Sequence, residues 1–275
     1  MKVIIIPTDF SERAHNATNY GIEMAKSIGA CVLLLHVYPV GTNITESPSE
    51  LVAIDEIKQG IDQQLEELKA RLQEEHTSLK IYFEARVGKV LEEIVAVCES
   101  VNPIAVVIGS KGTTSLEHVM FGSTTLTLIR NLRWPVICVP SKKQYSAGIN
   151  KIGFACDFRE VVATMPIHFL RDVVKEFNAE LHILNINPHH DQGNPNTAEQ
   201  SLHLHTMIED LQPSYHFIQE KHIGEALDAF AVSNGIDILI ASPRKHNLFE
   251  TFFKASHTRQ LVFHSHAPVM CIHAE

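Results

Sequence analysis

Short apolar runs alternate with segments of helical periodicity along the whole chain. Residues 3–6, 31–37 and 104–108 are mostly apolar and have the length of strands that are buried on both faces, and 3–6 and 104–108 are rich in β-branched side chains. Between the strands, apolar positions recur at the spacing of one helix face. In the first half, these helical segments are residues 14–28, 49–75, 90–99 and 125–132. Alternating strands and helices require crossover connections, so the pattern predicts parallel sheets covered on both faces, a doubly wound α/β fold.

The same order of segments occurs twice. A buried strand that ends in Asp-Phe opens each half, at Asp9-Phe10 and again at Asp157-Phe158. Four matches occur in the same order. They pair residues 4–11 with 152–159, 31–37 with 180–186, 87–94 with 223–230, and 134–139 with 267–272. The polar segment 141–148 reads as a linker, so the repeat predicts two tandem five-stranded sheets, in domains of residues 1–142 and 149–275.

Composition narrows the class of protein. The 275 residues, 45% of them hydrophobic, suffice for two ordinary cores. A formal net charge of −9 without a basic run argues against nucleic acid as a partner, and no apolar stretch approaches the roughly 18 residues of a membrane span. Five cysteines without a C-x-x-C pair read as small buried hydrophobes, with Cys156 the one thiol that a strand end could expose. We expect a cytoplasmic protein.

The stretch Gly109-Ser110-Lys111-Gly112, followed at some distance by Gly122-Ser123-Thr124, carries the strongest chemical signal. Gly109 stands where a buried strand ends, and Ser123 and Thr124 open the next helix. Glycine leaves no Cβ in the way of a ligand and allows positive φ, while a helix start offers unpaired N–H groups to an anion. The stretch therefore favours phosphate binding. It matches neither the P-loop nor the dinucleotide pattern.

Simpler interpretations stay open for three residues. Ser123 is also a suitable N-cap for its helix. Asp9, at the end of the first strand, is suited either to accept hydrogen bonds from a ribose or to cap the helix that begins near Ser11. Val37, at the end of the second strand, is either a core residue or a wall for a base. In open parallel sheets ligands bind beyond the carboxyl ends of the strands, where Asp9, Val37 and Gly109 fall.

Taken together, the glycine pattern and the preceding Pro7-Thr8-Asp9 resemble the ATP-binding pattern of universal stress proteins. The likeness covers the whole chain as two tandem domains. It implies the strand order 3-2-1-4-5 in each half and pairing through the fifth strands, an internal pseudo-dimer. It also implies ATP, with magnesium, as the cofactor. The implied nucleotide-binding residues are Pro7, Thr8, Asp9, Val37, Ile108, Gly109, Lys111, Gly112, Gly122, Ser123 and Thr124.

In the resemblance, Asp9 lies near the adenosine, Val37 holds adenine through its backbone, and the glycine segment holds the phosphates. The second half departs from this pattern. Its counterparts of Gly109, Gly112, Gly122 and Ser123 are Ala241, Arg244, Lys254 and Ala255. Side chains there would block the approach that glycine permits, and Pro243 removes an N–H donor. We expect one nucleotide per chain, in the first half, with the second domain degenerate.

Seventeen histidines include His189-His190, His203-x-His205 and His264-x-His266, but no zinc-ligand spacing accompanies them, so no metal site is predicted. No catalytic motif stands out, and no catalytic residue is assigned. The sequence favours a nucleotide-dependent regulatory module that acts on a protein partner, with a further homodimer left open. The alternatives are a slow ATPase, an enzyme that phosphorylates itself at Ser110, Ser123 or Thr124, and a scaffold without nucleotide.

Overall fold

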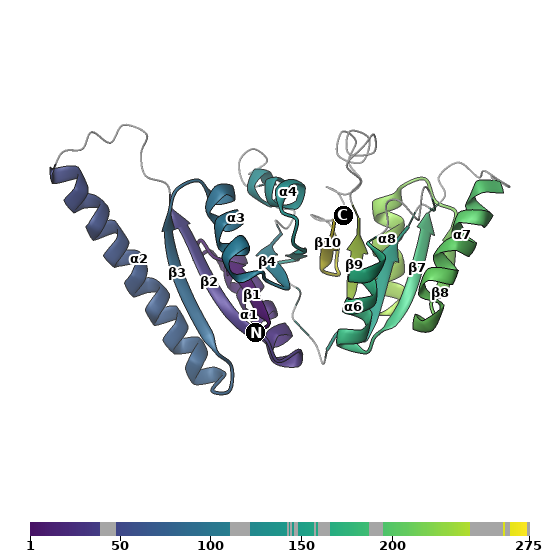
Figure 1. The fold of residues 1–275 in the computed structure, drawn as a ribbon, viewed down its shortest axis with the longest axis horizontal. Helices are drawn as coiled ribbons and strands as arrows, with labels where there is room; N and C mark the ends of the chain where they lie inside the picture. The colour runs from purple at the N-terminus through teal and green to yellow at the C-terminus, as the bar shows by residue number, and fades with distance from the viewer. Residues whose placement is uncertain are drawn as a thin grey trace.

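A computed structural model gives the architecture of the chain. It describes all residues except 39–47, 111–121, 142, 144, 146–147, 157, 159–165, 187–194, 243–260, 262–264 and 274–275. The side chains of residues 48–55, 122–123 and 195–197 are likewise not described. The strands form one continuous sheet that extends across the molecule, with helices packed along it (Figure 1).

The first half contains nine elements in the predicted alternation. They are β1 (Val3–Pro7), α1 (Glu12–Ser27), β2 (Cys31–Tyr38), α2 (Pro48–Glu75), β3 (Ile81–Val87), α3 (Val90–Val101), β4 (Ala105–Gly109), α4 (Gly122–Asn131) and β5 (Val136–Val139). The described elements of the second half follow the same order, and most of them are shorter than their counterparts. They are β6 (Lys151–Ala155), α6 (Ile167–Phe177), β7 (Glu180–Ile186), α7 (Pro195–Ile208), a 3-10 turn (Glu209–Leu211), β8 (Ser214–Ile218), α8 (Ile223–Asn234), β9 (Ile238–Ala241) and β10 (Val269–Cys271).

The strands form one ten-stranded sheet in the order β3-β2-β1-β4-β5-β10-β9-β6-β7-β8. Each half therefore has the order 3-2-1-4-5, which confirms the predicted fold. The halves join through their fifth strands, which pair antiparallel with Val269 opposite Cys138 and Cys271 opposite Val136. All other strand pairs are parallel. The predicted domain limits, 1–142 and 149–275, stay a prediction.

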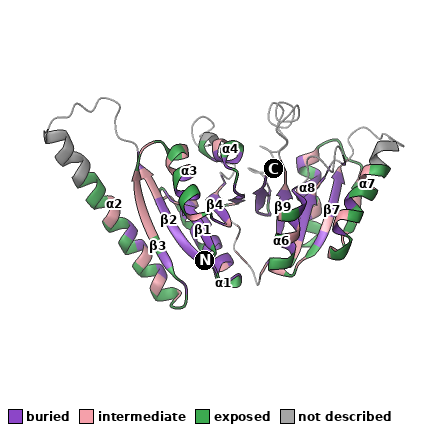
Figure 2. Cartoon of the chain, viewed as in Figure 1, coloured by how far each residue is buried: buried purple, intermediate pink, exposed green. Residues whose placement is uncertain are grey.

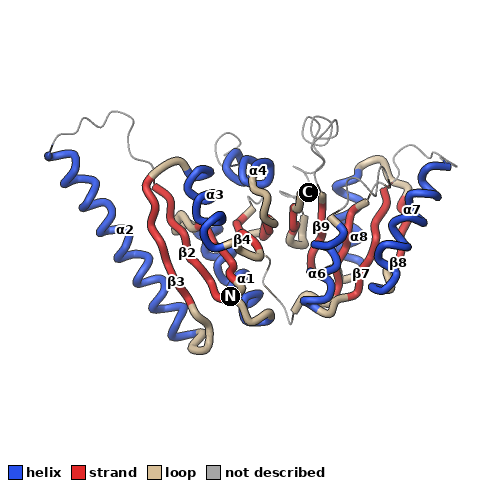
Figure 3. The backbone as a smooth tube through the Cα atoms, viewed as in Figure 1, coloured by secondary structure: helices blue, strands red, loops and turns tan. Residues whose placement is uncertain are grey.

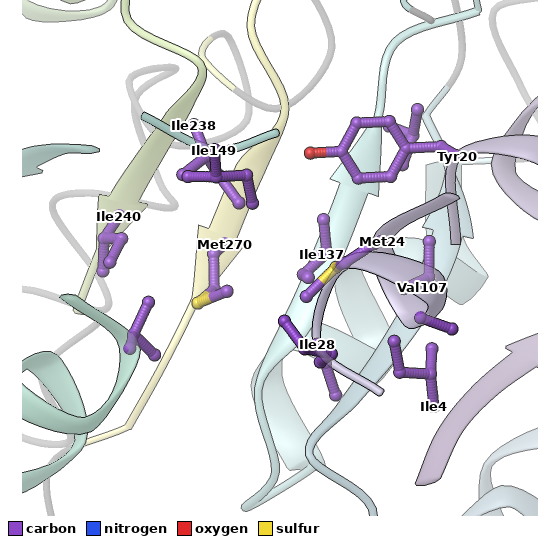
Figure 4. Packing of buried hydrophobic residues seen from close by; sticks show 14 of the residues in the cluster. Ile4, Tyr20, Met24, Ile28, Val107, Ile137, Ile149, Ile238, Ile240 and Met270 are labelled. Carbon is purple, nitrogen blue, oxygen red and sulfur yellow. The ribbon is translucent and has the colours of Figure 1, made fainter. Parts of the chain in front are cut away.

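Two apolar layers cover the sheet. Helices α1, α2, α6 and α7 pack on one face, and α3, α4 and α8 on the other, each with its own cluster of buried side chains. Figure 2 shows that the central strands are buried, that the edge strand β3 is mostly of intermediate exposure, and that the helices are exposed on their outer sides. Figure 3 shows the same layers by element type. At the junction, Met24 and Ile137 of the first half lie opposite Met270 and Ile149 of the second (Figure 4). Both clusters cross the junction, so the halves share their cores.

Local sequence explains where helices begin and end. Ser11 caps α1 through its hydroxyl, which accepts from the backbone N–H of Ala14 at 3.3 Å. At the other ends, Asn102, Asn178 and Gly235 adopt the left-handed conformation that terminates α3, α6 and α8. Helix α1 thus starts at Glu12, two residues before the predicted limit at Ala14, because the polar cap sets its start.

The five cysteines are buried and form no disulfide, which confirms their reading as small apolar side chains. Burial raises the pKa of Cys98 and of Cys271 to about 12, so both stay thiols at neutral pH. Cys156 is only 5% exposed, and its position at a strand end does not make it reachable. Within the described residues, no helix is both long and apolar enough to cross a membrane.

The shared core predicts that a single substitution at the junction weakens the whole sheet. Met270 is 2% exposed and lies opposite Ile137 in the β5–β10 register. Replacing Met270 by Ala leaves a cavity between the halves, which we expect to lower the free energy of unfolding by about 2–5 kcal/mol in urea denaturation.

The matched control is Leu202→Ala on α7, where the side chain is 64% exposed and the change should stay within about 0.5 kcal/mol. A Met270→Ala protein as stable as the wild type would mean that the junction is not packed as described.

Candidate functional site

The carboxyl end of β1 is fixed to β2 by backbone and side-chain hydrogen bonds. The N–H of Thr8 donates to Leu35 O at 2.9 Å, and the carbonyl of Thr8 accepts from His36 Nδ1 at 2.7 Å. The Thr8 hydroxyl oxygen accepts from the N–H of Phe10 at 3.1 Å. Thr8 is itself buried, so it holds the turn after β1 in one shape. Pro7 and Thr8 were predicted to line the wall beside the nucleotide. Pro7 is the last residue of β1, and Thr8 fixes the turn that follows it.

Asp9 lies at the exposed start of that turn. Its Oδ1 accepts from both the N–H of Ser11, at 3.0 Å, and the Ser11 hydroxyl. Ser11, not Asp9, is the N-cap of α1. Asp9 therefore orients the capping residue with one carboxylate oxygen. Within the described part of the chain, its Oδ2 receives no hydrogen bond, so this oxygen can accept from a ligand.

An aromatic pair stands beside the carboxylate. Phe10 has a positive φ of 60°, which is strained for a bulky residue, and its ring is 36% exposed. The ring stacks on the His36 imidazole with the centroids 4.8 Å apart. Sequence reasoning did not include Phe10 or His36 in the site. The repeat of Asp-Phe in both halves was the available signal.

Val37 is the last but one residue of β2. It lies one residue after His36, is half-buried, and packs against the core cluster under α3 and α4. On β3, Arg86 is its register partner and forms an ion pair with Glu84 at 2.7 Å. The side chain of Val37 thus joins the core, as one of its two readings predicted, whereas the reading as a wall for a base stays a prediction.

Gly109 ends β4, as predicted, but for a packing reason. A Cβ built at this position would lie 2.7 Å from the carbonyl oxygen of Arg13 in the first turn of α1. Its φ is not positive, so the predicted conformational reason is wrong for this glycine. Ser110 follows, 2% exposed, with its hydroxyl donating to Val139 O at 3.2 Å. Ile108 is buried in the core, so it anchors the end of β4.

The phosphate end of the predicted site is described only in part. Helix α4 begins at Gly122, where the motif predicted a helix start, and Thr124 is exposed in its first turn. Lys111 and Gly112 lie outside the described residues, and the side chain of Ser123 is not described. The structure therefore brings together β1, β2 and β4, with β1 between its two neighbours.

The second half keeps the turn but changes its chemistry. Cys156 N–H donates to Leu184 O at 2.9 Å, and Phe158 N–H donates to Cys156 Sγ at 3.4 Å. Asn185 donates from Nδ2 to Cys156 O at 2.9 Å, in the place of His36. Phe158 repeats the positive φ, at 51°, yet it is only 2% exposed and packs beside Phe217.

The glycine counterparts of the second half are mostly outside the described residues. Ala241 ends β9, the strand equivalent to β4, in register with Ala155. Arg244, Lys254 and Ala255 are not described, and neither is Asp157. The two halves are therefore compared at Phe10 and Phe158, because both of these residues are described.

Of the histidine pairs that the sequence singled out, His189, His190 and His264 lie outside the described residues. Among the described residues, no group of three ligand side chains is placed to hold a metal ion. The structure instead pairs His182 on β7 with His216 on β8, whose ring nitrogens lie 3.0 Å apart. Phe230 of α8 packs on His216, with the centroids 4.7 Å apart. Glu180 lies 3.6 Å from His182 Nε2. No sequence spacing indicated this pair.

The chain is similar to known proteins in both sequence and fold. The model of the universal stress protein family matches residues 1–140. The chain is 30% identical to the universal stress proteins MJ0531 and MJ0577 of Methanocaldococcus jannaschii. The first match covers 52% of the chain and 84% of the relative, the second 51% and 96%. A universal stress protein structure from Archaeoglobus fulgidus DSM 4304 matches 98% of both chains with a TM-score of 0.73, at 18% identity.

The close approach of Arg13 predicts that Gly109 is needed for folding, whatever it binds. In Gly109→Ala the new Cβ meets a backbone carbonyl that cannot move alone, so we expect a loss of about 1–3 kcal/mol in unfolding free energy. The control is Gly60→Ala in the exposed part of α2, where no atom lies within 4 Å. This change should stabilise the protein by about 0.5–1 kcal/mol. Equal effects at the two glycines would contradict the packing argument.

Burial lowers the pKa of His216, and the neighbouring His182 lowers it further. Because the unfolded value of about 6.5 is higher, the unfolded chain binds more protons than the native one just below that pH. This group's contribution to stability is therefore lost as the pH falls below about 6.5.

We expect His216→Gln to reduce the drop in unfolding free energy between about pH 7.5 and about pH 5.5. The same substitution at the exposed His168 should leave the drop as in the wild type. Thermal unfolding across this range measures both, and an unchanged drop in His216→Gln would refute the assignment.

Proposed function

The chain belongs to the universal stress protein family, and we propose on this premise that it binds ATP, as the magnesium complex, at the strand ends of its first half. Bound nucleotide would then alter a surface that a partner protein reads in a stress response. The observation that supports this most directly is Asp9, an exposed carboxylate with one oxygen held by Ser11 at the end of β1.

Asp9 and Val37 would hold the nucleoside. Oδ2 of Asp9 is available to accept hydrogen bonds from the ribose hydroxyls, while Oδ1 stays on Ser11. The backbone at Val37 would face the base, with Pro7 and Thr8 forming the wall beside it. Thr8 supports this role because three hydrogen bonds fix its position between Leu35, His36 and Phe10.

The phosphates would lie between the end of β4 and the start of α4. The first N–H groups of a helix have no partner within the helix, and its dipole favours an anion there. Gly109, Lys111 and Gly112 would line the loop, and Gly122, Ser123 and Thr124 the helix start. Magnesium would enter on the phosphates, and no protein ligand for it is assigned.

In the second half we propose that no nucleotide binds. Arg244 and Lys254 stand where the first half has Gly112 and Gly122, so side chains replace the bare backbone. The Phe158 ring supports this view, since it is 2% exposed in the turn where Phe10 is 36% exposed.

Binding, not turnover, is the proposed output. The Ser110 hydroxyl is buried and donates to Val139 O, which makes it a poor acceptor for phosphate transfer. We propose that the protein is cytoplasmic. This location is supported by five buried cysteines that form no disulfide, as expected in a reducing compartment.

Calorimetric titration with MgATP tests the site. We expect saturable binding of one nucleotide per chain. Gly112→Arg, which copies Arg244 of the second half, should weaken binding at least about ten-fold, because its side chain occupies the space of the phosphates.

Gly60→Ala is the control for the loss of a glycine away from the site, and its affinity should equal that of the wild type. Unchanged binding in Gly112→Arg would move the nucleotide to another place. If the wild type released ADP from ATP faster than buffer alone does, and Gly122→Val did not, the protein would instead be an enzyme.

A further inference from the structure

The second half of the chain contacts the helix that begins the proposed phosphate site. His273, two residues beyond β10, donates from Nε2 to the carbonyl oxygen of Ile129 at 2.6 Å. A carbonyl can only accept, so Nε2 carries the proton in this contact. The bond joins positions 144 residues apart and crosses the junction between the halves.

Ile129 O belongs to the last turn of α4, where carbonyls have no partner within the helix. The neighbouring Leu128 O accepts from the N–H of Leu132 at 2.9 Å, whereas the described donor to Ile129 O is His273. The preceding residue, Ile272, is 2% exposed, and its N–H donates to Ala241 O at 3.1 Å, so the backbone there is held by β9.

Packing ties α4 to the second half as well. Leu128 and Ile129 are buried in the same cluster as Val269, Cys271 and Ala267. In Figure 1, β10 lies near the centre of the molecule, on the side of the second half that faces α4. The orientation of α4 is therefore set by contacts on both sides of the junction, with His273 at its carboxyl end.

The two ends of the proposed nucleotide site differ in their distance from this junction. In the sheet order, only β5 lies between β4 and β10. Between β2 and β10 lie β1, β4 and β5, so β2 is farther from the junction. The nucleoside residues on β1 and β2 thus depend on the first half. The phosphate end depends on α4, which the second half supports.

We propose that His273 is a positioning residue for phosphate binding: by capping the carboxyl end of α4, it holds the amino end of the helix toward the triphosphate. This inference rests on the proposed function. It gives the second half a role that needs no nucleotide of its own. Because the helix is rigid over its ten residues, a tilt at Ile129 is carried to Gly122.

The test compares two ligands in three variants. Loss of one neutral hydrogen bond in His273→Ala should weaken MgATP binding about two- to ten-fold. Adenosine affinity, measured by competition against labelled ATP, should not change, because adenosine does not reach α4. His273→Gln should restore ATP binding, since the Gln amide places an N–H donor near the position of Nε2.

His266→Ala is the matched control. His266 lies seven positions earlier, is 76% exposed at its side chain, and bonds to Asp228 on α8 at 2.8 Å, away from α4. It should bind both ligands as the wild type does. Thermal unfolding of each variant shows whether the fold is kept.

Equal weakening of ATP and adenosine in His273→Ala would indicate general loosening and overturn the inference. Wild-type ATP affinity in His273→Ala, or no recovery in His273→Gln, would overturn it too. A wild-type protein that binds no ATP would refute the proposed function itself, a result distinct from ATP binding that does not depend on His273.

Discussion

The antiparallel pairing of β5 with β10 is the contact on which the rest of the structure depends. A five-stranded sheet alone would leave the polar backbone of its fifth strand unpaired at an exposed edge. Pairing the two fifth strands satisfies those groups and turns two sheets into one. Residues that would otherwise line two open edges become core. Asn16, which donates to Pro140 O and Lys143 O, and Lys2, which pairs with Glu176, add polar contacts around it.

This junction also separates the roles of the two halves. Membership in the universal stress protein family is carried by the first half, which the family model matches. The second half has the same strand order and the same turn after its first strand. Its turn is closed by the buried Phe158, and its counterpart of Gly109 is Ala241. A repeat can keep its fold and lose its ligand, because buried strands specify the fold whereas a few loop residues specify the site.

The site itself shows how packing and binding share residues. Gly109 lacks a side chain because Arg13 O approaches it, and Thr8 is buried because it holds the turn beside Asp9. Neither role excludes a ligand, since both fix the loops that a ligand would meet. Asp9 is the residue of this group that is exposed and keeps an oxygen for a partner.

The sequence by itself determined the alternation of strands and helices, the internal repeat, and the motif residues at the ends of β1 and β4. These follow from periodicity and from local backbone chemistry, which act between near neighbours. The pairing of the fifth strands was implied by the family resemblance, not by the hydrophobic pattern of the sequence. Only the tertiary structure decided that Arg13 crowds Gly109, that His182 meets His216, and that His273 reaches Ile129. Each of these contacts joins residues far apart in the chain, and a pattern along one strand or helix specifies which face is buried but not which partner lies against it.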